Sequence, residues 1–147
     1  MAIINGVDLV VLKTELANAH YTGMSDAGAA ADLNLSPSWN ASDKIARELI
    51  PSYELFEAII PSEWAAATAQ EKQRLQLILG MGIVAVRGAN TQQAFRDAFG
   101  AGTTTRANLI ALLTRACSRA EFLAATLFPG GAVRLITRDD VLWARSS

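Results

Sequence analysis

The chain is poor in the residues that most often build catalytic and metal sites. Its 147 residues include one histidine, His20, and one cysteine, Cys117. A single histidine removes most Ser–His–Asp, Cys–His and multi-histidine sites, and a single cysteine excludes an intrachain disulfide and a cysteine-based zinc site. We therefore expect His20 to have a structural or surface role and Cys117 to be a small buried residue. We expect no enzymatic activity, no cofactor and no metal ion.

Long apolar runs are also missing. The longest candidate, Leu75–Val86, is interrupted by a glutamine and two glycines, and so falls short of the roughly 18 apolar residues that a membrane span needs. The N-terminal segment has no basic stretch and is interrupted by Asp8, which does not fit a signal peptide. We expect no contact with a membrane, and a reducing cytoplasm as the place of assembly.

Aromatic residues are scarce, and much of the apolar content is alanine. Ten residues are aromatic and 27 are alanine, while 51% of the chain is hydrophobic. Alanine is the best helix former, and period-two runs of valine, isoleucine and threonine are rare in this chain. The composition therefore predicts an all-α fold. The length is that of one domain, so we expect residues 1–147 to form a single compact helical domain.

Capping patterns divide this domain into seven or eight short helices. Asp8 and Ser25 precede the first two, and Ser52 is a suitable cap for a helix over residues 53–59. Two later helices begin with capping boxes, Thr68–Glu71 and Ser118–Glu121. Helices this short are unstable alone, so tertiary packing must hold them.

Other segments carry weaker patterns. Residues 43–49 are expected to form one or two helical turns, and residues 83–86 form either a last helical turn or a short strand. The threonines at 103–105 cap a helix expected to reach about Ala116, and the helix that follows Ser118 is expected to reach about Leu127.

The C-terminal part follows a strong break at residues 128–131, Phe-Pro-Gly-Gly. Residues 133–136 are short, apolar and β-branched enough to be extended, and Thr137 then caps a terminal helix. We expect the segment from about 129 to 147 to be a C-terminal arm, able to dock on a partner or to add a strand to it.

Charge is divided unevenly along the chain. Residues 1–73 carry ten acidic and four basic side chains, whereas residues 74–147 carry nine arginines, no lysine and four acidic side chains. Two parts of opposite sign can meet in neighbouring copies of a protein, and arginine favours interfacial pairing. The alternative is that both parts are ordinary solvated surface.

The second part supplies our candidate contact residues, which are five arginines and a tryptophan, since both types are frequent at interface hot spots. They are Arg115, Arg119, Arg134, Arg138, Trp143 and Arg145. Their expected partners are the carboxylates of the next copy, Glu54, Glu57 and Glu63. Trp143 has the alternative of packing on its own domain.

Two other classes of function stay open at this point. The arginines would also suit a small helical nucleic-acid-binding regulator, although interleaved exposed aromatics are missing. The three carboxylates near Trp64 would also suit an enzyme that uses a bound metal, although no calcium-loop spacing accompanies them. An acidic surface face is the ordinary explanation of these carboxylates.

Six stretches of the chain form a recognisable series: Tyr21–Asp26, Glu54–Trp64, Ala69–Arg74, Ala98–Ala107, Ser118–Glu121 and Asp140–Arg145. In collinear order they resemble a family of small, all-helical tailed-bacteriophage proteins encoded among virion morphogenesis genes. The last stretch is similar to the D-V-x-x-A-R tail of that family. The chain departs from the family pattern at Leu35–Lys44 and at Pro129–Ala132.

The resemblance implies a virion structural component that acts by oligomeric assembly. The first expectation is a head–tail connector or neck (adaptor) protein, and the second is a capsid- or tail-associated minor virion protein. Its partners would be copies of itself in a ring and other virion proteins such as portal, capsid or tail components. The arginine-rich half would also be able to contact packaged DNA without sequence preference.

Overall fold

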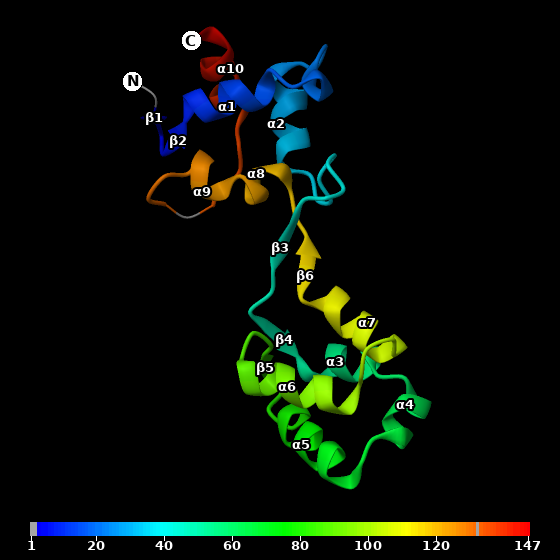
Figure 1. Cartoon of the computed structure of the whole chain (residues 1–147). Helices are drawn as coiled ribbons and strands as arrows, with labels where there is room; N and C mark the ends of the chain where they lie inside the picture. Colours follow the sequence, from blue (N-terminus) through cyan, green and yellow to red (C-terminus); the bar gives the residue numbers. More distant parts are fainter. Residues whose placement is uncertain (1–2, 132) are drawn as a thin grey trace. The chain divides into compact units, whose positions relative to one another are not determined.

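The structure is a computed structural model that describes residues 3–131 and 133–147. It consists of two compact units with separate cores (Figure 1). Unit 1 combines Met1–Ile45 with Ala116–Ser147, and unit 2 is the intervening Ala46–Arg115. Our prediction of a single domain over residues 1–147 stays a prediction.

The all-α prediction is wrong. The structure is mixed α/β, with 56% of residues in helices and 11% in strands. Three two-stranded sheets are present among the described residues: β1 (Ile3–Ile4) with β2 (Val7–Asp8), β3 (Lys44–Ala46) with β6 (Thr114–Ala116), and β4 (Leu49–Pro51) with β5 (Ile83–Ala85). Strands β3 and β6 carry the chain from one unit to the other and back.

The helices are short. Unit 1 contains α1 (Leu9–Leu16), the 3-10 helix η1 (Ala19–Tyr21), α2 (Asp26–Asn34), α8 (Arg119–Phe122), α9 (Ala124–Leu127) and α10 (Arg138–Ser146). Unit 2 contains α3 (Ser52–Ala58), α4 (Pro61–Ala66), α5 (Ala69–Leu79), α6 (Ala89–Ala98) and α7 (Thr104–Leu112).

Strands form where distant apolar residues meet. They replace the helical turns predicted for residues 43–49, and they confirm the short strand that was one alternative for residues 83–86. Ile50 of β4 lies opposite Val84 of the antiparallel strand β5, and both side chains are buried. Pairing and burial of β-branched residues outweigh the weak local preference for helix in residues 43–49. The helix expected to reach Ala116 ends at Leu112 for the same reason, because the chain then enters β6.

Most predicted caps are confirmed. Asp8 and Ser25 accept hydrogen bonds from the first turns of α1 and α2, and both predicted capping boxes are present at α5 and α8. The prediction for Ser52 is wrong, because Pro51 occupies the cap position and Ser52 is the first residue of α3. The buried Ser52 hydroxyl has no hydrogen-bond partner among the described residues.

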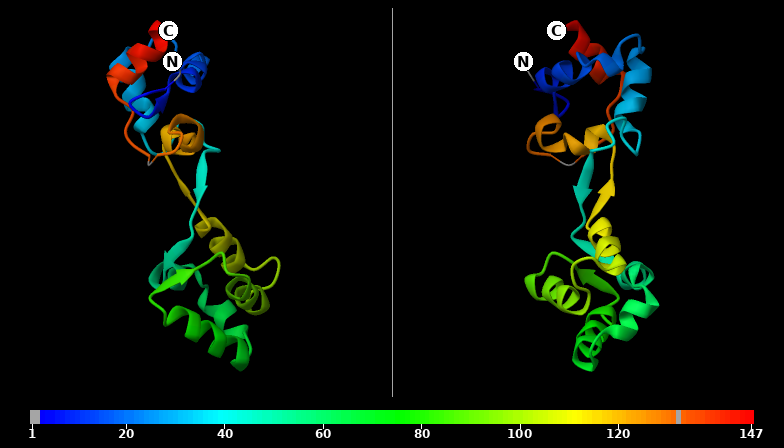
Figure 2. Two further views of the ribbon diagram at one scale, coloured as in Figure 1. Left: turned by 90° about the vertical axis from the view of Figure 1, so that its left-hand side faces the viewer. Right: turned by 45° about the vertical axis from the view of Figure 1, so that its right-hand side comes forward.

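Unit 1 closes its core with the C-terminal helix. Helix α10 packs against α1 and α2, and both views of Figure 2 show the red C-terminal helix beside the blue N-terminal ones. Val141 and Ala144 of α10 are fully buried, together with Leu12 and Leu33 from the N-terminal part. The predicted arm thus docks on its own unit here, except that residue 132 lies outside the described residues.

The segment that leads into α10 forms no regular strand between residues 133 and 136. The side-chain amide of Asn34 instead replaces a neighbouring strand. Its Oδ1 accepts from the backbone N–H of Ile136 at 2.9 Å, and its Nδ2 donates to the Ile136 carbonyl at 2.8 Å. The expected extended segment is therefore held by a side chain.

A buried carboxylate anchors the start of α10. The carboxylate of Asp140 accepts from the Arg134 guanidinium at 2.8 and 3.0 Å and from the Thr137 backbone N–H at 2.8 Å. Burial by itself raises the pKa of Asp140, but the hydrogen bonds from Arg134 and Thr137 outweigh burial and hold that pKa below its ordinary value.

This carboxylate should make unit 1 acid-sensitive. Because its pKa is lower in the folded than in the unfolded chain, its stabilisation is complete above about pH 4 and is lost as pH falls through the folded pKa. We expect Asp140→Asn to lower the free energy of unfolding near neutral pH by about 1–3 kcal/mol and to weaken the acid dependence. Urea unfolding from neutral to acid pH measures both. Asp139→Asn, at the exposed neighbouring position, is the control, and equal acid dependence in both variants would contradict the prediction.

Unit 2 has its own core around α3, α5, α6 and the β4–β5 pair. Ile50, Leu75, Val84 and Phe99 are almost completely buried in it. Helix α5 packs against α6, and α3 packs against both α5 and α7. This arrangement leaves one face of α3, and the space between α6 and α7, on the surface of unit 2.

Candidate functional site

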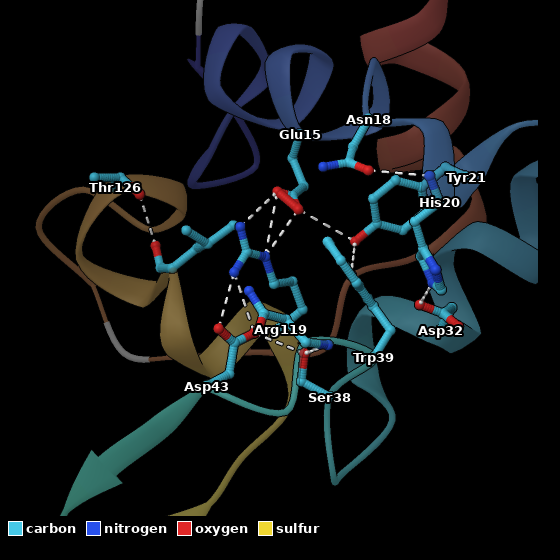
Figure 3. Close-up of polar contacts among 12 residues, drawn as sticks. Glu15, Asn18, His20, Tyr21, Asp32, Ser38, Trp39, Asp43, Arg119 and Thr126 are labelled. Atoms are coloured by element: carbon cyan, nitrogen blue, oxygen red, sulfur yellow. Dashed lines mark hydrogen bonds and ion pairs between the residues drawn. The ribbon is translucent and has the colours of Figure 1, made fainter.

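Arg119 is the centre of an ion-pair network inside unit 1 (Figure 3). Its Nε lies 2.8 Å from Oε1 of Glu15, and its Nη1 lies 2.9 Å from Oδ1 of Asp43. The three side chains are 15%, 7% and 1% exposed, respectively. The planar guanidinium therefore uses its donors within its own chain, and a role of Arg119 at an interface stays a prediction.

Aromatic rings surround this network. The Arg119 guanidinium lies 5.4 Å from the ring centroid of Trp39, which suits a cation–π contact. The Trp39 indole N–H donates to the hydroxyl of Tyr21 at 2.9 Å, and burial raises the pKa of that hydroxyl. His20 stacks on Trp39 with the ring centroids 4.4 Å apart, and its Nε2 lies 2.8 Å from Oδ1 of Asp32. These contacts give His20 a structural role.

Two more candidate arginines are also paired inside unit 1. Arg134 pairs with Asp140, as described above, and Arg145 Nη1 lies 2.7 Å from Oδ1 of Asp26. The remaining candidates from residues 74–147 lie at the surface. Arg115 and Arg138 are exposed, and Trp143 is 36% exposed.

The three candidate carboxylates differ from one another. Glu54 forms an ion pair with Arg47, and Glu57 is exposed. Glu63 of α4 accepts hydrogen bonds from the backbone N–H groups of Thr104 and Thr105 at 2.9 and 2.7 Å, at the start of α7. The hydrogen bonds from Thr105 hold the pKa of Glu63 below its ordinary value. Glu54 and Glu63 are therefore used within unit 2.

The fully buried Thr105 completes this junction between α4 and α7. Its Oγ1 accepts from the Ile60 backbone N–H at 2.9 Å. Thr105→Val keeps the shape but leaves that N–H without its acceptor, so we expect a loss of about 1–3 kcal/mol in the free energy of unfolding. Chemical denaturation measures this loss. Thr104→Val, at an exposed position, should change stability little, and equal losses in the two variants would contradict the role of Thr105.

The fold also redistributes the charge that the sequence separates. Unit 1 carries six basic and eight acidic side chains, and unit 2 carries seven and six. Arginines from the second half of the sequence pair with carboxylates from the first half, as Arg119 does with Glu15 and Arg145 with Asp26. Each unit is therefore close to neutral, and neither carries the large charge imbalance of one half of the sequence.

Unit 2 presents two further surface features. The first is the α6–α7 pocket, a hollow of about 160 Å³ with a mostly apolar lining. The apolar lining is Leu55, Val86, Phe95, Leu109, Ile110 and Leu113. Two arginines, Arg96 and Arg106, belong to the same lining, one from each helix. Arg106 and Leu109 are three residues apart and therefore lie on one face of α7.

The second feature is the α3 aromatic face, which consists of Tyr53, Phe56 and Glu57. Tyr53 and Phe56 are 69% and 65% exposed, whereas Leu55 and Ala58 of the same helix are buried. Phe56 and Glu57 also border a groove of about 640 Å³ that α3, α4 and α5 form. Helix α3 thus buries one side and leaves two aromatic rings in water on the other.

The arrangement offers little to a metal ion in the part of the chain that the structure describes. No group of three or more His, Cys, Asp or Glu side chains is placed to hold one there. Cys117 is completely buried. Among the described helices, none is long and apolar enough to cross a membrane.

Comparison with protein-family models, curated proteins and solved structures gives no match to this chain.

Proposed function

We propose that this protein is a structural component of a tailed-bacteriophage virion, and that it acts by oligomeric assembly as part of the head–tail connector or neck. Two observations support the proposal. The sequence stretches that resemble phage morphogenesis proteins support a place in the virion. The apolar surface of unit 2 supports a function through contact with other proteins.

That surface carries the proposal. Tyr53 and Phe56 are exposed on α3, and Leu49 and Ile83 are 60% and 61% exposed on the β4–β5 pair. Leu49 and Ile83 share one face of that pair, because alternate side chains of a strand point to opposite faces. Large exposed apolar side chains on one small unit are typical of protein–protein interaction sites.

The proposed partners are copies of this chain in a ring, and portal, capsid or tail proteins that the ring contacts. Assembly would take place in the host cytoplasm. Contact with packaged DNA would fall to exposed arginines such as Arg138, because Arg119, Arg134 and Arg145 are engaged in ion pairs. This engagement argues against the rival function of a small nucleic-acid-binding regulator, which needs free cations along one face.

The test uses the purified full-length chain and the virion proteins of the same source. The chain is mixed separately with portal rings, capsids and tails, and each mixture is sedimented through a density gradient. We expect the chain to sediment with the portal-containing particles. A chain that sediments with capsids or tails instead would be a minor protein of those parts and would overturn the connector assignment.

A chain that sediments alone in every mixture would overturn the virion proposal itself. The regulator is tested in parallel by binding to duplex DNA at rising salt, where affinity should fall steeply if phosphates are contacted. Salt-sensitive binding of isolated chains to DNA, without binding to any virion particle, would favour the regulator.

A further inference from the structure

The α6–α7 pocket has the size of an aromatic ring. Its volume is about 160 Å³, and an apolar protein cavity of about 150 Å³ is known to take up benzene. The ring of Phe95 and the side chains of Leu109 and Leu113 line it. Ile110, also in the lining, is 58% exposed, so the pocket is open to a side chain that arrives from outside.

The positive charge at the pocket favours a ligand whose aromatic ring lies next to a negatively charged group. Arg96 is exposed and donates to Oε1 of Gln93 at 3.3 Å, whereas Arg106 is half-buried. Neither arginine forms a salt bridge with any residue that the structure describes. An apolar hollow with two guanidinium groups outside any salt bridge favours a ligand that carries an apolar group and a carboxylate side by side.

The α3 aromatic face carries this combination. Phe56 is 65% exposed, and the next residue, Glu57, is exposed and has no ion pair in the described parts of the chain. Glu54, one turn earlier, is neutralised by Arg47. The exposed ring of Phe56 and the uncompensated charge of Glu57 are therefore adjacent on one helix.

We infer that the α3 aromatic face of one copy of this chain binds the α6–α7 pocket of a second copy. The ring of Phe56 enters the pocket, and Glu57 pairs with Arg96 or Arg106. This inference rests on the proposed function, because it names the contact through which copies assemble. Since the two surfaces are different parts of unit 2, the contact is heterologous, and its repetition gives a closed ring or an open filament.

The first test is self-association of the full chain, measured by sedimentation velocity over a series of concentrations. We expect Phe56→Ala to raise the dissociation constant at least about tenfold, as the loss of a central aromatic anchor does. The matched control is Leu77→Ala on α5, because Leu77 is 73% exposed in the same unit but belongs to neither surface. It should associate as the unsubstituted chain does.

The second test separates the two halves of the contact. Thr91 of α6 also lines the pocket. Phe56→Ala keeps the pocket, whereas Thr91→Trp fills the pocket and keeps the ring of Phe56. We expect each variant to be monomeric at concentrations where the unsubstituted chain associates. Their mixture should form a one-to-one dimer that grows no further, because only one intact pair of surfaces remains.

Charge reversal is a third test, and it does not depend on whether the Thr91→Trp variant folds. Glu57→Arg, or Arg96→Glu with Arg106→Glu, should each weaken association. One chain that carries all three substitutions should recover it, because every copy then offers an arginine to two glutamates. Failure of that chain to recover association would overturn the proposed pairing of charges.

Other results overturn the inference as a whole. The inference is wrong if the unsubstituted chain stays monomeric at all concentrations. It is also wrong if the Phe56→Ala variant associates like the unsubstituted chain. A monomeric chain that still sediments with portal-containing particles would remove this contact and leave the proposed function in place. Binding of another virion protein at the pocket, with Phe56→Ala binding it unchanged, would also assign the pocket to that protein and overturn the contact between copies.

Discussion

Arg119→Ala is expected to lower the free energy of unfolding by about 3–5 kcal/mol. The substitution leaves the carboxylates of Glu15 and Asp43, which are 7% and 1% exposed, without their counterion. Breaking a buried ion pair by removing one partner costs this much because an uncompensated buried charge remains. The side chain also packs near Trp39, so its loss removes apolar contact as well. Chemical denaturation followed by the fluorescence of Trp39 and the other tryptophans measures the change.

The control is an arginine whose ion pair is exposed. Arg74 pairs with Asp97 on the surface of unit 2, where the side chains are 48% and 39% exposed. Surface pairs contribute little to stability, so Arg74→Ala should shift the denaturation midpoint only slightly. Equal shifts in the two variants would mean that the Arg119 network does not stabilise unit 1.

Phe99→Ala is expected to lower the free energy of unfolding of unit 2 by about 3–5 kcal/mol. Phe99 is completely buried in the core of unit 2, and truncation of a buried phenylalanine leaves a cavity as well as losing burial. The two units have separate cores, so we expect amide hydrogen exchange to accelerate within residues 46–115 and to change little elsewhere.

Phe56→Ala is the matched control for this prediction, since it removes the same ring from an exposed position of the same unit. It should leave both stability and exchange nearly unchanged in the monomer. If Phe99→Ala accelerated exchange equally throughout the chain, the two units would unfold as one cooperative block. That outcome would support the single domain expected from chain length.

The sequence predicted helix starts well because they depend on neighbouring residues. A cap such as Ser25 and a box such as Thr68–Glu71 satisfy the backbone N–H groups of their own first turn, so the pattern and its partners are local. The strands were missed where pairing joins distant segments, except that a short strand was one of the two predictions for residues 83–86, where β5 lies. Nothing near Ile50 indicates that Val84 will lie opposite it, and the two are paired only in the folded chain.

The division into two units and the pairing of charges were missed for the same reason. The excess of arginine after residue 73 suggested a surface of one sign. The fold instead places Arg119 next to Glu15 and Asp43, which are far away in the sequence. Ion pairs of this kind depend on the topology, which a count of charges along the chain does not contain.

The α6–α7 pocket was partly visible in the sequence. Leu109 and Leu113 follow the apolar spacing of one helix face, and Arg106 stands one turn before Leu109 on the same face. An arginine that continues an apolar stripe indicates a stripe that reaches the surface, as it does here. The exposure of Phe56 had no comparable signal, because Leu55 and Phe56 are equally apolar and only the fold decides which of them turns inward.

Unit 2 lies within unit 1 in the sequence, so the two units complete their folding at different times during synthesis. Residues 46–115 are contiguous, so unit 2 can fold as soon as they have left the exit tunnel. The N-terminal helices emerge earlier but must wait for Val141 and Ala144, which complete their core. Until the last helix is synthesised, the apolar faces of α1 and α2 stay open to chaperones and proteases. In a nascent chain halted before residue 138, unit 2 would therefore be folded, while the apolar faces of α1 and α2 would still be exposed.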